Sequence, residues 1–148
     1  MRSLPLVTSA LAVAAVLVPS LPAQAAPAIQ ITRVYYDSPG SDRRSNTSLN
    51  GEYVTITNNT SRAIDLEGWA LKDKTGYTYT FGPDVILGAR KKITVRSGQG
   101  SDGTSTVYWG RRAYVWNNDR DAAYIRRADG KLIDYCSYHS TRYDYKNC

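Results

Sequence analysis

The sequence predicts an all-β protein, a β-sandwich of about seven to eight short strands. Apolar residues recur at every second position along most of the chain, which is the period of a half-buried strand. No apolar stripe with helical spacing is long enough for a substantial helix beyond the N-terminal segment. The aromatic residues are 12 Tyr and 3 Trp against 1 Phe. Tyrosine suits a pleated surface because it buries a ring and leaves a hydroxyl in water.

The N-terminal segment predicts export from the cell. Residues 1–25 contain Arg2, an apolar run from Ala10 to Val18 and a small-residue cleavage pattern ending at Ala25, as in a secretory signal peptide. The uninterrupted apolar sequence is shorter than the roughly 20 residues that cross a bilayer, so we expect no stable membrane anchor. The sequence therefore predicts a secreted protein, with residues 26–148 forming one domain.

The first strands of this domain follow from alternation and turn residues. Ile29 to Tyr35 predicts a strand, and the polar stretch "DSPGSDRRSNTSLNG" at residues 37–51 predicts a long mobile loop. The segment "EYVTITNN" alternates well. We expect its Val54 and Ile56 to face the core and its threonines to face outward.

A tryptophan follows a glycine near the middle of the chain. Ile64 and Leu66 begin a strand that Gly68 interrupts immediately before Trp69, and Leu71 lies on the same strand face as the indole. A large indole directly after a glycine predicts a sheet corner, where the ring fills the gap between two sheets. We therefore expect Trp69 in the core. A ligand-stacking role for this indole is the alternative.

The second half of the chain continues the strand pattern. Predicted strands lie in the segments "YTYTF", "KKITVRSG" and "VYWGRRAYVWNNDRD". The segments "AAYIRR" and "KLIDYCSY" predict a hairpin that turns at Asp129-Gly130. The residues expected in the core by this pattern are Val54, Ile56, Leu66, Trp69, Leu71, Trp116 and Ile125.

The chain has 2 cysteines, Cys136 and Cys148. In an oxidising compartment an even pair predicts a disulfide, which would attach the C-terminus to the domain. A zinc site normally needs more Cys or His ligands than this sequence offers, so we expect no metal at this pair.

Several segments, in this order and spacing, resemble the lamin tail domain family in its secreted bacterial type. They are "GEYVTITNNTSRAIDLEGWALKD", "YTF", "ITVRSGQG", "YWG" and "VWNNDRDAAYI", and the resemblance extends from Ile29 to about Tyr138. The sequence departs from the family in two turns. Arg120 stands where the family usually has glycine, and Gly88-Ala89 replaces a frequent Pro-Gly.

This resemblance implies an immunoglobulin-like β-sandwich without catalytic residues or cofactors. The resemblance implies an interaction module, since lamin tails contact DNA and proteins. Bacterial copies of the domain occur beside secreted nucleases and other hydrolases. The expected protein is thus a non-enzymatic extracellular binding or adhesion module. Its partner would be an unspecified protein or extracellular polymer.

Two enzymatic or metal-dependent alternatives stay open. The single histidine, His139, makes a Ser/His/Asp triad or a His-rich metal site hard to build. A hydrolase based on paired carboxylates is a weaker alternative, because such pairs are recognised by their separation in space. Asp119 and Asp121, with two asparagines, could bind calcium. Ordinary turn chemistry is the simpler interpretation of that cluster.

Neighbouring basic residues suggest a second function class. If Ala123 and Ile125 face inward, then Tyr124 and Arg126 face outward. This places an aromatic ring beside an arginine. Phosphate contacts and stacking make such interleaving suitable for DNA or an anionic cell-wall polymer. The alternative is an ordinary solvated surface. The candidate polyanion-binding residues are Arg111, Arg112, Tyr124, Arg126 and Arg127.

Overall fold

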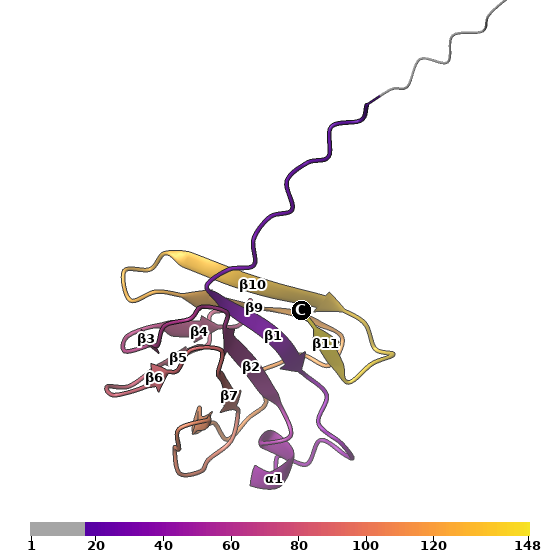
Figure 1. The fold of residues 1–148 in the computed structure, drawn as a ribbon. Coiled ribbons are helices and arrows are strands. Elements are labelled where there is room, and N and C mark those ends of the chain that lie inside the picture. Colours follow the sequence, from indigo (N-terminus) through magenta and orange to yellow (C-terminus); the bar gives the residue numbers. More distant parts are fainter. Residues whose placement is uncertain (1–16) are drawn as a thin grey trace, which may run out of the picture.

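The structure, a computed structural model, describes residues 17–148. Most of the apolar run of the predicted signal peptide falls in residues 1–16, outside this range. Residues 17–28 lead into the first strand without regular secondary structure (Figure 1). Within the described range, no helix is long and apolar enough to cross a membrane.

Two sheets pack face to face and form the sandwich (Figure 1). The five-stranded sheet has the order β11-β1-β2-β7-β8, with β1 (Ile29–Tyr35), β2 (Tyr53–Asn58), β7 (Lys92–Arg96), β8 (Thr106–Tyr108) and β11 (Tyr145–Asn147). The four-stranded sheet has the order β10-β9-β4-β5, with β4 (Ala70–Lys72), β5 (Thr78–Thr80), β9 (Arg120–Arg126) and β10 (Leu132–His139). The short strands β3 (Ile64–Asp65) and β6 (Ile86–Leu87) pair with each other.

The all-β, immunoglobulin-like sandwich predicted from the sequence is confirmed. Strand pairing is antiparallel except between β7 and β8, which run parallel. The described residues contain more strands than the seven or eight expected. The extra strands, such as β6 and β11, span only two or three residues, which is too short for alternation to reveal them.

The core lies between the two sheets. Val54, Ile56, Leu71 and Ile125 are buried there because alternate side chains of each strand point to the same face. Leu66 and Trp116 are also buried, from segments that connect strands. Trp116 is the tryptophan at the centre: its side chain is 2% exposed and meets the ring of Trp109 edge to face.

Trp69 differs from the expectation of a fully enclosed indole. Gly68 has a φ of 76°, so the chain does bend immediately before Trp69. The ring is half-buried and packs against the rim of the core. The largest aromatic side chains of the interior are instead Trp116, Tyr36 and Phe81.

The segment after β1, which the sequence predicts as a long mobile loop, contains regular structure. Residues 37–51 contain a short helix, α1 (Asn46–Leu49). The side chain of Ser45 caps this helix by accepting a hydrogen bond from the backbone N–H of Ser48 at 3.2 Å. Leu49 is buried. This apolar contact and the hydrogen bonds from the Asn46 and Asn50 amides to the carbonyl of Gln99, each 2.9 Å, attach the segment to the sandwich.

The predicted disulfide is present and joins the two sheets. Cys136 lies in β10 of the four-stranded sheet, and Cys148 follows β11 of the five-stranded sheet. The rings of Tyr36 and Tyr138 stack near the same end, with centroids 3.8 Å apart. The C-terminal strand β11 is attached to the domain by this disulfide and by the stacking of Tyr145 on Tyr35, whose ring centroids are 5.7 Å apart.

Candidate functional site

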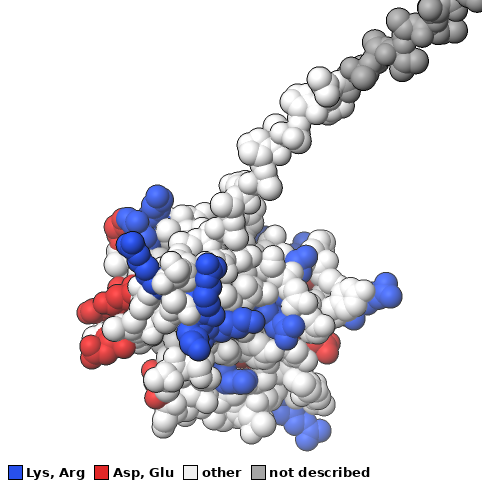
Figure 2. Space-filling model, viewed as in Figure 1, with Lys and Arg blue, Asp and Glu red and all other residues white. Residues whose placement is uncertain are grey.

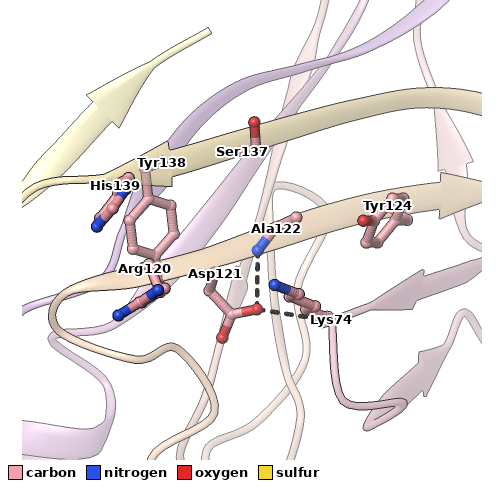
Figure 3. Close-up of a pocket in the computed structure, with 8 residues that line it drawn as sticks. All are labelled: Lys74, Arg120, Asp121, Ala122, Tyr124, Ser137, Tyr138 and His139. Carbon is pink, nitrogen blue, oxygen red and sulfur yellow. Dashed lines mark hydrogen bonds between the residues drawn. The ribbon is translucent and has the colours of Figure 1, made fainter.

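Basic and aromatic side chains line the outer face of the four-stranded sheet. Two adjoining surface depressions share Lys74 and Tyr124, and their other lining residues include Lys72, Arg120 and Arg126. We call these five residues, with Ser137 and His139, the four-stranded outer face. Figure 3 shows one part of it, where Arg120 and His139 lie at one end, Tyr124 lies at the other and Lys74 approaches from below.

Strand pairing positions these side chains. Lys72 on β4 is directly opposite Tyr124 on β9, and Arg120 on β9 is opposite His139 on β10. Opposed residues in an antiparallel pair project from the same face of the sheet. The turn after β4 then brings Lys74 over β9, where its backbone N–H bonds to Asp121.

The carboxylates in this region face inward. Asp121 and Asp73 are each 3% exposed. Asp121 accepts backbone hydrogen bonds from Lys74 at 3.0 Å and from Ala122 at 2.8 Å (Figure 3), and a third from Asn117 at 3.2 Å. Asp121 lines one depression and Asp73 lines the other, but because both are nearly buried, the exposed charge there comes mainly from the cationic side chains.

Asp73 has the same structural role in the neighbouring turn. Its Oδ1 accepts the backbone N–H groups of Gly76 and Tyr77, both at 2.7 Å. These bonds from backbone donors fix the turn between β4 and β5. Asp73 and Asp121 shape the site from below and do not offer free carboxylate oxygens to a ligand.

Aromatic surface continues across the sheet. Tyr124 stacks on Tyr135 of β10, with ring centroids 6.1 Å apart and an angle of 22° between the planes. Tyr135 is 59% exposed. The face therefore offers both positive charge and an accessible ring, the combination that suits polyanion backbones and stacked groups.

The residues predicted to bind a polyanion are distributed over several places. Tyr124 and Arg126 lie on the four-stranded outer face, where Arg126 also donates to the carbonyl of Gly130 at 3.0 Å. Arg127 forms a salt bridge with Asp129 in the turn between β9 and β10. The hydrogen bond from Arg127 lowers the pKa of the Asp129 carboxyl to about 2.

Arg111 and Arg112 belong to a different part of the surface. The guanidinium of Arg111 lies over the ring of Tyr77, 4.1 Å from its centroid, and Arg112 is exposed in the same loop. Neither lines the depressions described above. The sequence analysis did not select Lys72, Lys74 or Arg120. For Lys72 a signal existed, because Leu71 and Asp73 on either side of it are buried, so alternation along the strand turns Lys72 to the outer face.

The possible calcium cluster serves as turn structure. The oxygens of Asp121 accept backbone N–H groups, and the Asn118 amide donates to Asp37 at 3.0 Å and to Asp42 at 2.9 Å. Asp119 lies 3.5 Å from the Arg120 guanidinium. Across residues 17–148, no group of three or more His, Cys, Asp or Glu side chains is arranged to hold a metal ion.

The described residues thus form an immunoglobulin-like sandwich with a basic, aromatic outer face on the four-stranded sheet and with inward-facing carboxylates beneath it. The family model described as Lamin Tail Domain matches residues 22–140. The chain belongs to this family, whose immunoglobulin-like domains are often involved in binding and are typically non-catalytic. No curated protein matches the chain.

Proposed function

We propose that this protein is secreted and acts outside the cell as a non-catalytic binding module. The four-stranded outer face binds a polyanion, either DNA or an anionic cell-wall polymer. The export part of the proposal is supported by the signal-peptide pattern of residues 1–25. The binding part is supported by the family to which the chain belongs.

The observation that carries the proposal is the separation of charge across the four-stranded sheet. The cations of Lys72, Lys74, Arg120 and Arg126 project outward, whereas the carboxylates of Asp73 and Asp121, which also line the depressions, are buried and bonded to backbone N–H groups. The exposed carboxylate of Asp119 pairs with Arg120 but lines neither depression. A solvated surface without a binding role normally mixes both signs of charge. Here the exposed part of the depressions is predominantly positive.

A binding titration with two variants tests the proposal. We expect the mature domain to bind DNA at low salt and to lose affinity as salt rises, because binding releases counterions. The double variant Lys72→Gln/Lys74→Gln should bind more weakly and show a smaller salt dependence, by about 1 in slope per lost phosphate contact.

The matched control is Lys131→Gln/Arg142→Gln, which removes the same charge from exposed positions outside the four-stranded outer face. Equal losses in both double variants would show that net charge alone attracts the polymer. Absence of binding to DNA and to an anionic cell-wall polymer at low salt would refute the proposed function.

A further inference from the structure

The outer face of the five-stranded sheet carries a second basic surface. A depression of about 390 Å³ on this face is lined by Arg33, Lys92 and Arg96, by the ring of Tyr53, and by Thr32, Thr55 and Thr94. No carboxylate lines it. Figure 2 shows basic side chains gathered over the part of the molecule where Figure 1 places β2 and β7, with most acidic side chains in that view at the left rim.

An irregularity in β1 brings Arg33 to this face. The register between β1 and β2 shifts between Ile31 and Arg33, and the consecutive residues Thr32 and Arg33 are both half-buried. This is the pattern of a β-bulge, in which one extra residue resets the alternation. The backbone N–H of Ile31 donates to Asp134 of β10 at 2.8 Å. The other sheet thus holds the bulge in place.

A row of tyrosines crosses the same face. Tyr145, Tyr35 and Tyr53 are opposite one another on β11, β1 and β2. Their rings stack with centroid distances of 5.7 Å and 5.2 Å and interplanar angles of 20° and 23°. The guanidinium of Arg96 on β7 continues the row, 5.2 Å from the Tyr53 centroid.

This stack determines what a ligand can contact. Both faces of the Tyr35 ring are covered, because its stacking partners come from the strands on either side. Tyr53 is likewise enclosed between Tyr35 and Arg96. A nucleobase or a sugar ring therefore finds no free aromatic face at these two residues, and a ligand meets ring edges, hydroxyls and cations.

The donors that remain suit oxyanions. Arg33 lies 4.8 Å from the centroid of the Tyr145 ring and donates from Nε to Asn147 at 2.9 Å, which holds its planar group at the edge of the depression. Lys92 is exposed. Guanidinium groups recognise phosphate through paired N–H donors, and an ammonium adds a point charge.

Acidic residues do lie near one end of the tyrosine row. Burial first, and then the carboxylates of Asp144 and Asp37, raise the pKa of Tyr35. Neither carboxylate lines the depression. The outer face of the five-stranded sheet is thus positively charged around the depression, where Arg33, Lys92 and Arg96 lie.

We propose that the depression beside the tyrosine row on the five-stranded sheet binds the phosphate groups of a base-free phosphodiester polymer, through Arg33, Lys92 and Arg96. The ligand is held by charge and hydrogen bonds, without stacking. This depression is separate from the four-stranded outer face. A test can therefore refute binding at one of the two surfaces without refuting binding at the other.

Two oligomers of equal length separate backbone binding from base binding. One is oligothymidylate, and the other has the same phosphodiester backbone with abasic tetrahydrofuran units throughout. In the Lys72→Gln/Lys74→Gln background, which removes two of the four Lys and Arg charges of the four-stranded outer face, we expect the abasic oligomer to bind at least as tightly as oligothymidylate. Binding of oligothymidylate that is more than tenfold tighter would overturn the proposal, since it would require base stacking.

Variants on the five-stranded sheet locate the binding. Adding Arg33→Gln/Lys92→Gln to the same background should reduce the salt slope by about 1.4, the value for two phosphate contacts on a single strand. Adding Lys131→Gln/Arg142→Gln instead should leave the slope unchanged. Equal slopes in these two proteins would overturn the proposal. If the Arg33 variant does not fold, the single substitution Lys92→Glu at an exposed position replaces it. An unchanged affinity for the abasic oligomer in Lys92→Glu would also overturn the proposal.

Discussion

At the residue scale, Glu52 is the most unusual side chain of the core. It is fully buried, and its Oε2 accepts the backbone N–H of Val115 at 3.0 Å. Its Oε1 and the nearby Ser97 hydroxyl have no hydrogen-bond partner among the described residues. Burial raises the pKa of the Glu52 carboxyl from 4.5 to about 8, because a charged carboxylate is poorly solvated there.

The raised pKa of Glu52 predicts a pH-dependent stability. The folded protein retains the Glu52 proton up to about pH 8, whereas the unfolded chain releases it near pH 4.5. The free energy of unfolding should therefore fall as the pH rises through this window. Glu52→Gln preserves an acceptor and removes the ionisation, so it should flatten that fall. Urea unfolding at pH 5 and pH 8 measures both slopes, and identical slopes would contradict the assignment.

At the scale of the element, hydrophobic alternation predicted the long strands well. Val54, Ile56 and Ile125 are buried as expected because a period of two leaves little freedom of orientation once one face is covered. Trp69 shows the limit of this reasoning. Its glycine bend was predictable, but the ring is only half-buried, and alternation along a strand does not state how deeply a side chain is covered.

The candidate surfaces were harder to predict than the core. The spacing from Ile31 to Val34 is three rather than two, which is a signal of the bulge that turns Arg33 outward. The row formed by Tyr35, Tyr53 and Tyr145 depends on which strands are neighbours, and the sequence does not state this order. The disulfide was accessible to sequence reasoning because only one pairing of the two cysteines exists within the chain.

The disulfide predicts a local response in β11. Closure of a loop between residues 12 positions apart stabilises a domain by about 3 kcal/mol in the chain-entropy model. Reduction should lower the melting temperature and increase amide hydrogen exchange in β11, since the covalent link between the two sheets is lost. The double variant Cys136→Ala/Cys148→Ala should respond in the same way without reductant. Unchanged exchange in β11 after complete reduction would show that the strand is held by other contacts.

At the scale of the whole molecule, the two basic surfaces lie on the outer faces of opposite sheets. The hydrophobic core fills the space between these sheets. One polymer segment cannot readily occupy both surfaces. If both proposals hold, a single domain bridges two polymer chains, and the separate weak contacts combine into stronger attachment through multivalency.

Bridging predicts a concentration-dependent association that simple binding does not produce. Light scattering from mixtures with a long phosphodiester polymer should rise at intermediate protein-to-polymer ratios and fall at excess polymer, where each domain contacts separate chains. Lys72→Gln/Lys74→Gln and Arg33→Gln/Lys92→Gln should each retain binding but lose the scattering maximum. Lys131→Gln/Arg142→Gln, with the same loss of charge, should keep it. A maximum that survives in either single-face variant would mean that charge neutralisation, and not two opposed binding faces, brings the chains together.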